Sequence, residues 1–154
     1  MIEAAGRKLT AKTALFTSIA VAVIVFLNAV AAVARPTTGA GDLKTMSNLT
    51  IGMATARTYF SNNNDSYTGF NAAQAQHIQP NLNWADGNAV AVDVVNITGV
   101  NSTQVLLESL SASGKSFCIA DDWTRQVVRG YDPGIHVFSN YAGCAAAVGR
   151  WWGP

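Results

Sequence analysis

Residues 14–34 read ALFTSIAVAVIVFLNAVAAVA, a run of 21 residues without a charged side chain. As an α-helix, this run would be about 31 Å long, which is close to the thickness of the hydrocarbon core of a bilayer. The sequence therefore predicts a hydrophobic N-terminal helix that crosses a membrane or packs against copies of itself. The large apolar side chains that would form its contact surface are Leu15, Phe16, Ile19, Val23, Phe26, Leu27 and Val30.

The two flanks of this run differ in charge. Residues 1–13 contain Arg7, Lys8 and Lys12, whereas Arg35 is the one basic residue that follows the run directly. Because basic flanks stay on the cytoplasmic side, we predict a cytoplasmic N-terminus over residues 1–13 and an extracytoplasmic domain beyond the run. Residues 32–34, Ala-Val-Ala, also fit the small-residue pattern at which secretory signal peptides are cut. Release of a secreted domain after Ala34 is therefore the alternative.

A linker and a second helix are predicted next. Residues 35–41 read RPTTGAG, and proline and glycine disfavour a helix there. Asp42 is a suitable N-cap. We predict an amphipathic helix over residues 42–61, because apolar side chains recur at helical spacing. These side chains are Leu43, Met46, Leu49, Met53, Ala56 and Phe60.

The second half of the chain has the pattern of a β-sheet. Alternating, Val-rich segments predict strands over residues 89–97, 103–110, 115–120 and 125–130. Short Gly-, Asn- and Asp-containing turns separate them, which favours antiparallel pairing. The predicted fold class is α+β: a hydrophobic N-terminal helix, an amphipathic helix, and a small antiparallel sheet of about four strands. Residues 42–154 would form the extracytoplasmic head.

Composition limits the class of partner and the redox environment. Charged residues make up 12% of the chain, and six Lys or Arg against eight Asp or Glu follow Arg35, so no nucleic-acid partner is expected. Cys118 and Cys144 both lie beyond the apolar run. On an oxidising side of a membrane they would form one disulfide bond, and two buried free thiols are the alternative.

Residues that could carry chemistry are few. The two histidines, His77 and His136, lie in no sequence motif of a hydrolase or a metalloprotease, so we do not expect an enzyme. We expect no cofactor. Asp121, Asp122 and Asp132 flank the last predicted strand and are weak candidates for oxygen ligands of a Ca²⁺ ion.

Three segments together resemble one family of proteins. Residues 56–69 read ARTYFSNNNDSYTG, residues 82–84 read LNW, and residues 113–121 read SGKSFCIAD, with Cys144 as a second cysteine near the C-terminus. In this order, behind an apolar run, they resemble the head of a type IV pilin or of a type II secretion pseudopilin. The N-terminus departs from that family, because Gly6 precedes Arg7 instead of the apolar run, and residues 14–34 contain no Glu.

The resemblance implies a structural subunit of an extracellular pilus-like filament, assembled through the N-terminal apolar segment. It also implies a disulfide between Cys118 and Cys144, and Ca²⁺ in a C-terminal loop of some members. The implied partners are copies of the same chain, the membrane before assembly, and the pilus assembly machinery. The implied location is the bacterial cell envelope or an extracellular filament. A membrane-anchored, pilin-like adhesin or receptor that does not polymerise is the alternative.

Overall fold

The computed structural model describes residues 38–151. The predictions for the basic segment 1–13, for the hydrophobic helix 14–34 with its contact residues Leu15 to Val30, and for linker residues 35–37 lie outside the described residues. Within residues 38–151, no helix combines the length and the apolar character needed to cross a membrane.

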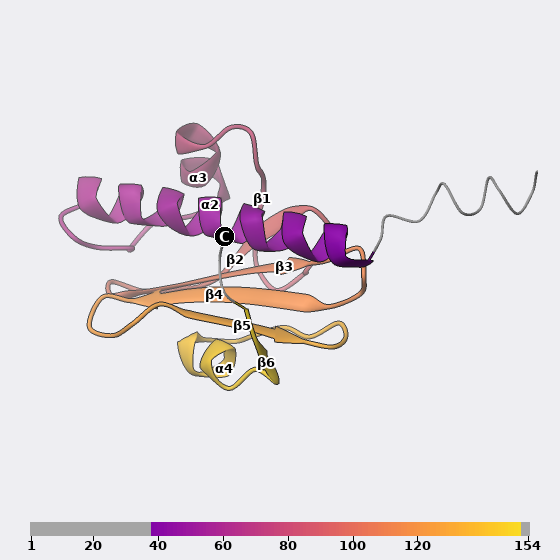
Figure 1. Ribbon diagram of the computed structural model, residues 1–154. Coiled ribbons are helices and arrows are strands. Elements are labelled where there is room, and N and C mark those ends of the chain that lie inside the picture. The colour runs from indigo at the N-terminus through magenta and orange to yellow at the C-terminus, as the bar shows by residue number, and fades with distance from the viewer. Residues whose placement is uncertain (1–37, 152–154) are drawn as a thin grey trace, which may run out of the picture. The chain divides into compact units, whose positions relative to one another are not determined.

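Three helices and six strands make up the described chain (Figure 1). The helices are α2 (Thr38–Asn62), α3 (Ala72–Ile78) and α4 (Tyr141–Ala145). The strands are β1 (Asn83–Asp86), β2 (Val94–Val100), β3 (Gln104–Leu110), β4 (Ser116–Asp122), β5 (Val128–Asp132) and β6 (Gly149–Arg150).

The sheet differs from the predicted one. It has six strands in the order β1-β2-β3-β4-β5-β6, and it is mixed, because β1 pairs with β2 in parallel while all other neighbours are antiparallel. The prediction of about four antiparallel strands is therefore wrong. The two additional strands are four and two residues long, too short to show a period-two pattern.

The parallel β1–β2 pair depends on a short return of the chain. Because β1 has four residues, it covers only about 13 Å, and residues 87–93 suffice to bring the chain back to the starting end of β1. Gly87 at φ 97° and Asp93 at φ 61° adopt the left-handed conformation at the two ends of this return. The predicted strand at residues 89–97 consequently begins only at Val94.

Helix α2 starts earlier than predicted. Its first residue is Thr38, so residues 38–41 of the expected linker are helical and Asp42 is not an N-cap. Gly41 lies against the β3–β4 turn, where an added Cβ would be 3.2 Å from Ala112 Cβ. A glycine at this position therefore allows the helix to approach the turn closely.

The sheet separates two apolar clusters. On one face, Leu49, Met53 and Phe60 of α2 are buried together with Leu107 and Ile119 of the central strands. The other face carries the smaller cluster of Leu106, Cys118, Ala120, Phe138 and Cys144, to which α4 contributes. Figure 1 shows α2 across one face of the sheet and α4 against the other. The predicted apolar face of α2 is confirmed except for Leu43, which is 63% exposed.

The disulfide bond between Cys118 and Cys144 is present, as predicted. It joins the central strand β4 to α4, with 5.8 Å between the two Cα atoms and 26 residues of sequence separation. A loop of that length corresponds to about 3 kcal/mol of stabilisation. Gly130 on the neighbouring strand leaves room for this link, because an added Cβ would lie 2.6 Å from the Cys144 carbonyl oxygen.

Candidate assembly surface

Three charged residues lie on α2: Asp42, Lys44 and Arg57. Asp42 is largely buried and accepts hydrogen bonds from Ser111 Oγ at 2.5 Å and Ser113 Oγ at 2.5 Å, together with an ion pair to Lys115 Nζ at 2.6 Å. Burial alone would raise the pKa of Asp42, but the bonds from Lys115 and the two serines outweigh it and hold that pKa below its ordinary value. This contact fixes the first turns of α2 to the β3–β4 turn.

Arg57 fixes the other half of the helix. Its Nε and Nη2 donate to Asp121 Oδ2 at 2.8 Å and to Oδ1 at 3.1 Å, a bidentate pair to a carboxylate that is almost completely buried in β4. Tyr67, from the loop after α2, donates its hydroxyl to Asp121 Oδ2 at 2.6 Å. Burial, and then the neighbouring Asp121, raise the pKa of the Tyr67 phenol above its ordinary value. Helix, loop and sheet therefore meet at one carboxylate.

Lys44 makes the third contact, with Asp93 Oδ2 at 2.9 Å, at an exposed position just before β2. An ion pair that is open to water adds little to stability. With this ion pair, each of the three charged residues of α2, Asp42, Lys44 and Arg57, has a partner on or next to the sheet.

Each charge on α2 is therefore paired, although the side chains of Lys44 and Arg57 remain 60% and 54% exposed beside the apolar residues of the helix. We call the solvent-facing side of α2 the outer stripe and define it as the residues at helical spacing on this side: Ala40, Leu43, Ser47, Ile51, Ala54 and Thr58. Leu43 is 63% and Ile51 38% exposed. A surface helix ordinarily places charged or polar side chains on the side opposite the core. A small and apolar stripe is instead typical of a surface that packs against another helix.

The three aspartates proposed as weak calcium ligands do not converge. Asp121 binds Arg57 and Tyr67, whereas Asp122 accepts from Thr124 and Gln104. Asp132 pairs with Ser116, at the opposite end of β4 from Asp121 and Asp122, and accepts the Val148 N–H. Across residues 38–151, no three His, Cys, Asp or Glu side chains form a group suited to a metal ion.

The histidines lie apart from one another in the fold. His77 is exposed on α3, and His136 stacks edge-on against Phe138 with 4.7 Å between ring centroids. The Asp132 Oδ2 atom is 3.7 Å from the His136 Nδ1 atom. Neither imidazole hydrogen-bonds to a Ser, Thr or Cys side chain in the described part of the chain, so neither has the arrangement of a base beside a nucleophile.

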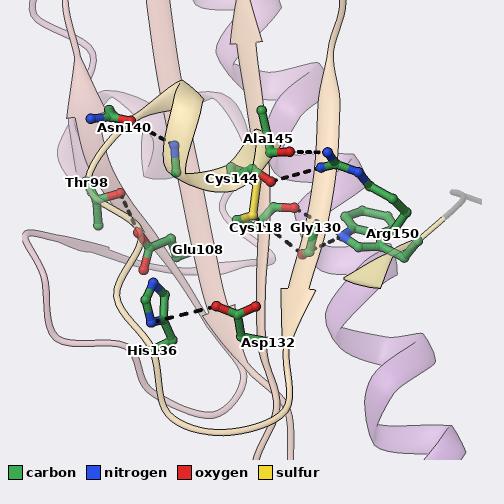
Figure 2. The surroundings of a disulfide bond; sticks show 12 residues. Thr98, Glu108, Cys118, Gly130, Asp132, His136, Asn140, Cys144, Ala145 and Arg150 are labelled. Carbon is green, nitrogen blue, oxygen red and sulfur yellow. Dashed lines mark hydrogen bonds and ion pairs between the residues drawn. A yellow bond between two sulfur atoms is a disulfide. The ribbon is translucent and has the colours of Figure 1, made fainter. Parts of the chain in front are cut away.

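The surroundings of the disulfide hold the C-terminal part of the domain in place (Figure 2). Arg150 donates to the Cys144 carbonyl at 3.0 Å and also to the Ala145 carbonyl at the end of α4. The indole N–H of Trp151 donates to the carbonyls of Cys118 at 3.0 Å and Gly130 at 3.1 Å. The covalent link and these bonds together attach α4 and β6 to β4 and β5.

Glu108 is a fully buried carboxyl group on the same side of the sheet as α4. Its Oε1 accepts from Thr98 Oγ1 at 3.1 Å, while its Oε2 and both side-chain polar atoms of Asn96, its neighbour on β2, have no partner among the described residues. Burial raises the pKa of Glu108 to about 7, although the bonds from Thr98 and the Phe138 backbone act in the opposite direction. Sequence alone gave no sign of this site, because its residues come from two strands and the segment after β5.

Comparison of the chain with protein-family models, with curated proteins and with solved structures finds no match.

Proposed function

We propose that this chain is a structural subunit of an extracellular, pilus-like filament. The outer stripe of α2 is the observation that carries the proposal. All three charged side chains of α2 are paired with groups on or next to the sheet, and the solvent-facing side of the helix presents Leu43, Ile51 and Ala54 beside the exposed but paired Lys44 and Arg57. Burial of the exposed apolar side chains against a neighbouring copy would lower the free energy of the assembly.

The stripe lies on the first helix of the described head and follows an apolar segment in the sequence. Residues 14–34 contain no charge and end a few residues before α2 begins. In the proposed filament, the apolar segments of neighbouring copies bury one another, and the outer stripe extends this contact toward the heads. Repeating contacts between two different patches produce an open helical filament when the rotation does not close a ring.

The internal links of the head are consistent with an extracellular, load-bearing role. The Cys118–Cys144 disulfide favours an oxidising environment. The Asp42 and Arg57 contacts fix both halves of α2 to the sheet, so a force on the helix would pass to the head through two ion pairs as well as through the apolar core. The proposed subunit is non-enzymatic, needs no nucleic acid, and depends on a membrane and assembly machinery before it polymerises.

A second candidate is a membrane-anchored, pilin-like receptor that remains monomeric. Large exposed apolar side chains in the segment after β5 favour it, since Ile135 is 77% and Val148 80% exposed. Such side chains suit a surface that binds another protein. The two candidates differ in which surface is covered: the outer stripe in a filament, and the segment after β5 in a monomeric receptor.

The test is a matched pair of lysine variants of the full chain, produced in a bacterial host with a pilus assembly system. Ala54→Lys places a charge in the middle of the outer stripe, and Ala73→Lys places the same charge at an exposed position of α3. Filaments are sheared from the cells and counted by negative-stain microscopy. We expect Ala54→Lys to reduce filament number at least tenfold at unchanged thermal stability, while Ala73→Lys assembles like the unaltered chain. Equal filament numbers for the two variants would contradict the proposal.

A further inference from the structure

Most basic side chains of the described head have a partner. Of its six Lys and Arg side chains, four form ion pairs, and Arg150 donates to two carbonyl groups. Among these six side chains, Arg129 is the one that has neither an ion pair nor a hydrogen bond to another described residue. Its Nε is buried and unpartnered.

Arg129 lines a hollow of about 260 Å³ beside β5 and β6. Its guanidinium lies over the ring of Trp151, 5.5 Å from the ring centroid, which fixes its direction. Trp151 is itself held by two bonds from its indole N–H. The hollow is lined by Gln126, Val127, Val128, Arg129, Arg150 and Trp151, so no acidic side chain lines it. A positioned guanidinium in a hollow without an acid is suited to bind a carboxylate from outside.

One carboxylate of the described residues also lacks a partner among them. Asp65 is exposed and has neither an ion pair nor a hydrogen bond within residues 38–151, whereas each of the other acidic side chains there has at least one.

The loop that carries Asp65 is held in one conformation. Asn64 and Asp65 both adopt positive φ, at 53° and 54°, which Asn and Asp tolerate better than other side chains. Asn63 Nδ2 donates to the Ser66 carbonyl at 2.9 Å and to the Thr68 carbonyl at 3.0 Å. The adjacent Tyr67 is fully buried, so the loop presents Asp65 from a fixed position.

We propose that Arg129 of one subunit binds Asp65 of a neighbouring copy, so that the hollow beside β5 and the loop after α2 form a contact between heads. This inference rests on the proposed filament. The two patches come from different parts of the chain, so the contact is heterologous, and its repetition extends an assembly instead of closing a symmetric pair. Because Arg129 and Asp65 have opposite charges and neither has a partner among the described residues, we assign the hollow to a second copy of the chain.

Charge reversal tests the contact in the full chain. Arg129→Glu and Asp65→Arg should each reduce the number of sheared filaments at least tenfold, because each places two like charges together. The double variant restores the opposite pair and should return at least half of the filaments. Failure of the double variant to recover, or a loss confined to Arg129→Glu, would overturn the inference, since the second result assigns the hollow to a different anion.

A cross-link separates failure of this contact from failure of the filament. Full chains carrying Asp65→Cys and Arg129→Cys are produced together and treated with a short bis-maleimide, and Ala73→Cys replaces Asp65→Cys in the control. We expect a covalent dimer only for the first combination. A dimer without filaments would support the contact and refute the filament. Filaments that require an uncharged residue 54, but give no dimer and withstand charge reversal, would overturn the contact and leave the proposed function standing.

Discussion

Asp121 is the residue at which three parts of the molecule are joined. Its carboxylate is almost completely buried, yet it receives two bonds from Arg57 and one from Tyr67. A buried charge without such donors would be strongly unfavourable, so the three donors and the carboxylate depend on one another. Helix α2 cannot shift along the sheet without breaking this group.

Tyr67→Phe tests how much the hydrogen bonds to Asp121 contribute to stability. The substitution keeps the ring, which packs on Phe60 with 4.5 Å between centroids, and removes only the hydroxyl that donates to Asp121. Because hydrogen bonds to charged groups contribute about 1.5–3 kcal/mol, we expect the free energy of unfolding to fall by about 2 kcal/mol in denaturant titrations. Tyr59→Phe is the matched control, since the Tyr59 hydroxyl donates to the Thr68 carbonyl in an exposed loop. Equal losses in the two variants would contradict a special role for Asp121.

Glu108 gives the head a dependence on pH. The folded protein raises the pKa of this group from its ordinary value of 4.5 to about 7. Between these values, the folded state binds a proton that the unfolded chain has released. The stabilisation by protonated Glu108 is therefore fully present below pH 4.5 and is lost as the pH rises through 7, by an amount of the order of 3 kcal/mol.

Glu108→Gln should remove this dependence, because the amide is neutral at every pH and still offers an oxygen to Thr98. We expect the unaltered protein to lose stability relative to Glu108→Gln between about pH 5 and pH 8, as measured by urea unfolding at a series of pH values. Ala73→Gln, which places the same amide at an exposed position of α3, should leave the pH profile unchanged. If the free energy of unfolding changed with pH in the same way in the unaltered protein and in Glu108→Gln, burial would not raise the pKa of Glu108.

At the scale of elements, α4 owes its place to the disulfide. The helix has five residues, too few to be stable alone, and Cys144 joins it to β4. Cys118→Ala combined with Cys144→Ala should lower the free energy of unfolding by about 3 kcal/mol. The unaltered protein measured with a reducing agent should show the same loss. If the double variant proves as stable as the oxidised protein, α4 is held by its packing and by Arg150 instead.

The buried face of α2 followed from the sequence, but its outer stripe did not. Leu49, Met53 and Phe60 recur at helical spacing and are buried. Leu43 and Met46 were assigned to the same face by two successive steps of three residues. Each such step falls about 60° short of a full turn, which places Leu43 about 120° from Leu49. Leu43 was predicted to be buried because it is apolar, but its direction on the helix places it in solvent.

The ion pairs of α2 and the two additional strands could not be predicted, for a different reason. Arg57 and Asp121 are separated by 64 residues, and nothing local to either residue indicates the other. Strand β6 has two residues and depends on the Trp151 and Arg150 bonds to stay beside β5. The disulfide was predictable because the chain has two cysteines and an oxidising location leaves one pairing.

At the scale of the whole molecule, most basic side chains of the described head are paired, and Leu43 and Ile51 leave exposed apolar surface on α2. The outer stripe of α2, the apolar residues 14–34, and the unpaired Arg129 and Asp65 are the features that the isolated head does not use. Assembly into a filament gives each of them a partner. A monomeric receptor would leave the outer stripe exposed to water.

Electron microscopy of material sheared from cells that produce the unaltered full chain tests the filament most directly. We predict thin filaments whose mass per length corresponds to regularly stacked copies of the chain, absent from cells that lack its gene. Full-length chain that reaches the cell surface but sediments only as single copies in detergent, with no filaments in the sheared material, would contradict the account.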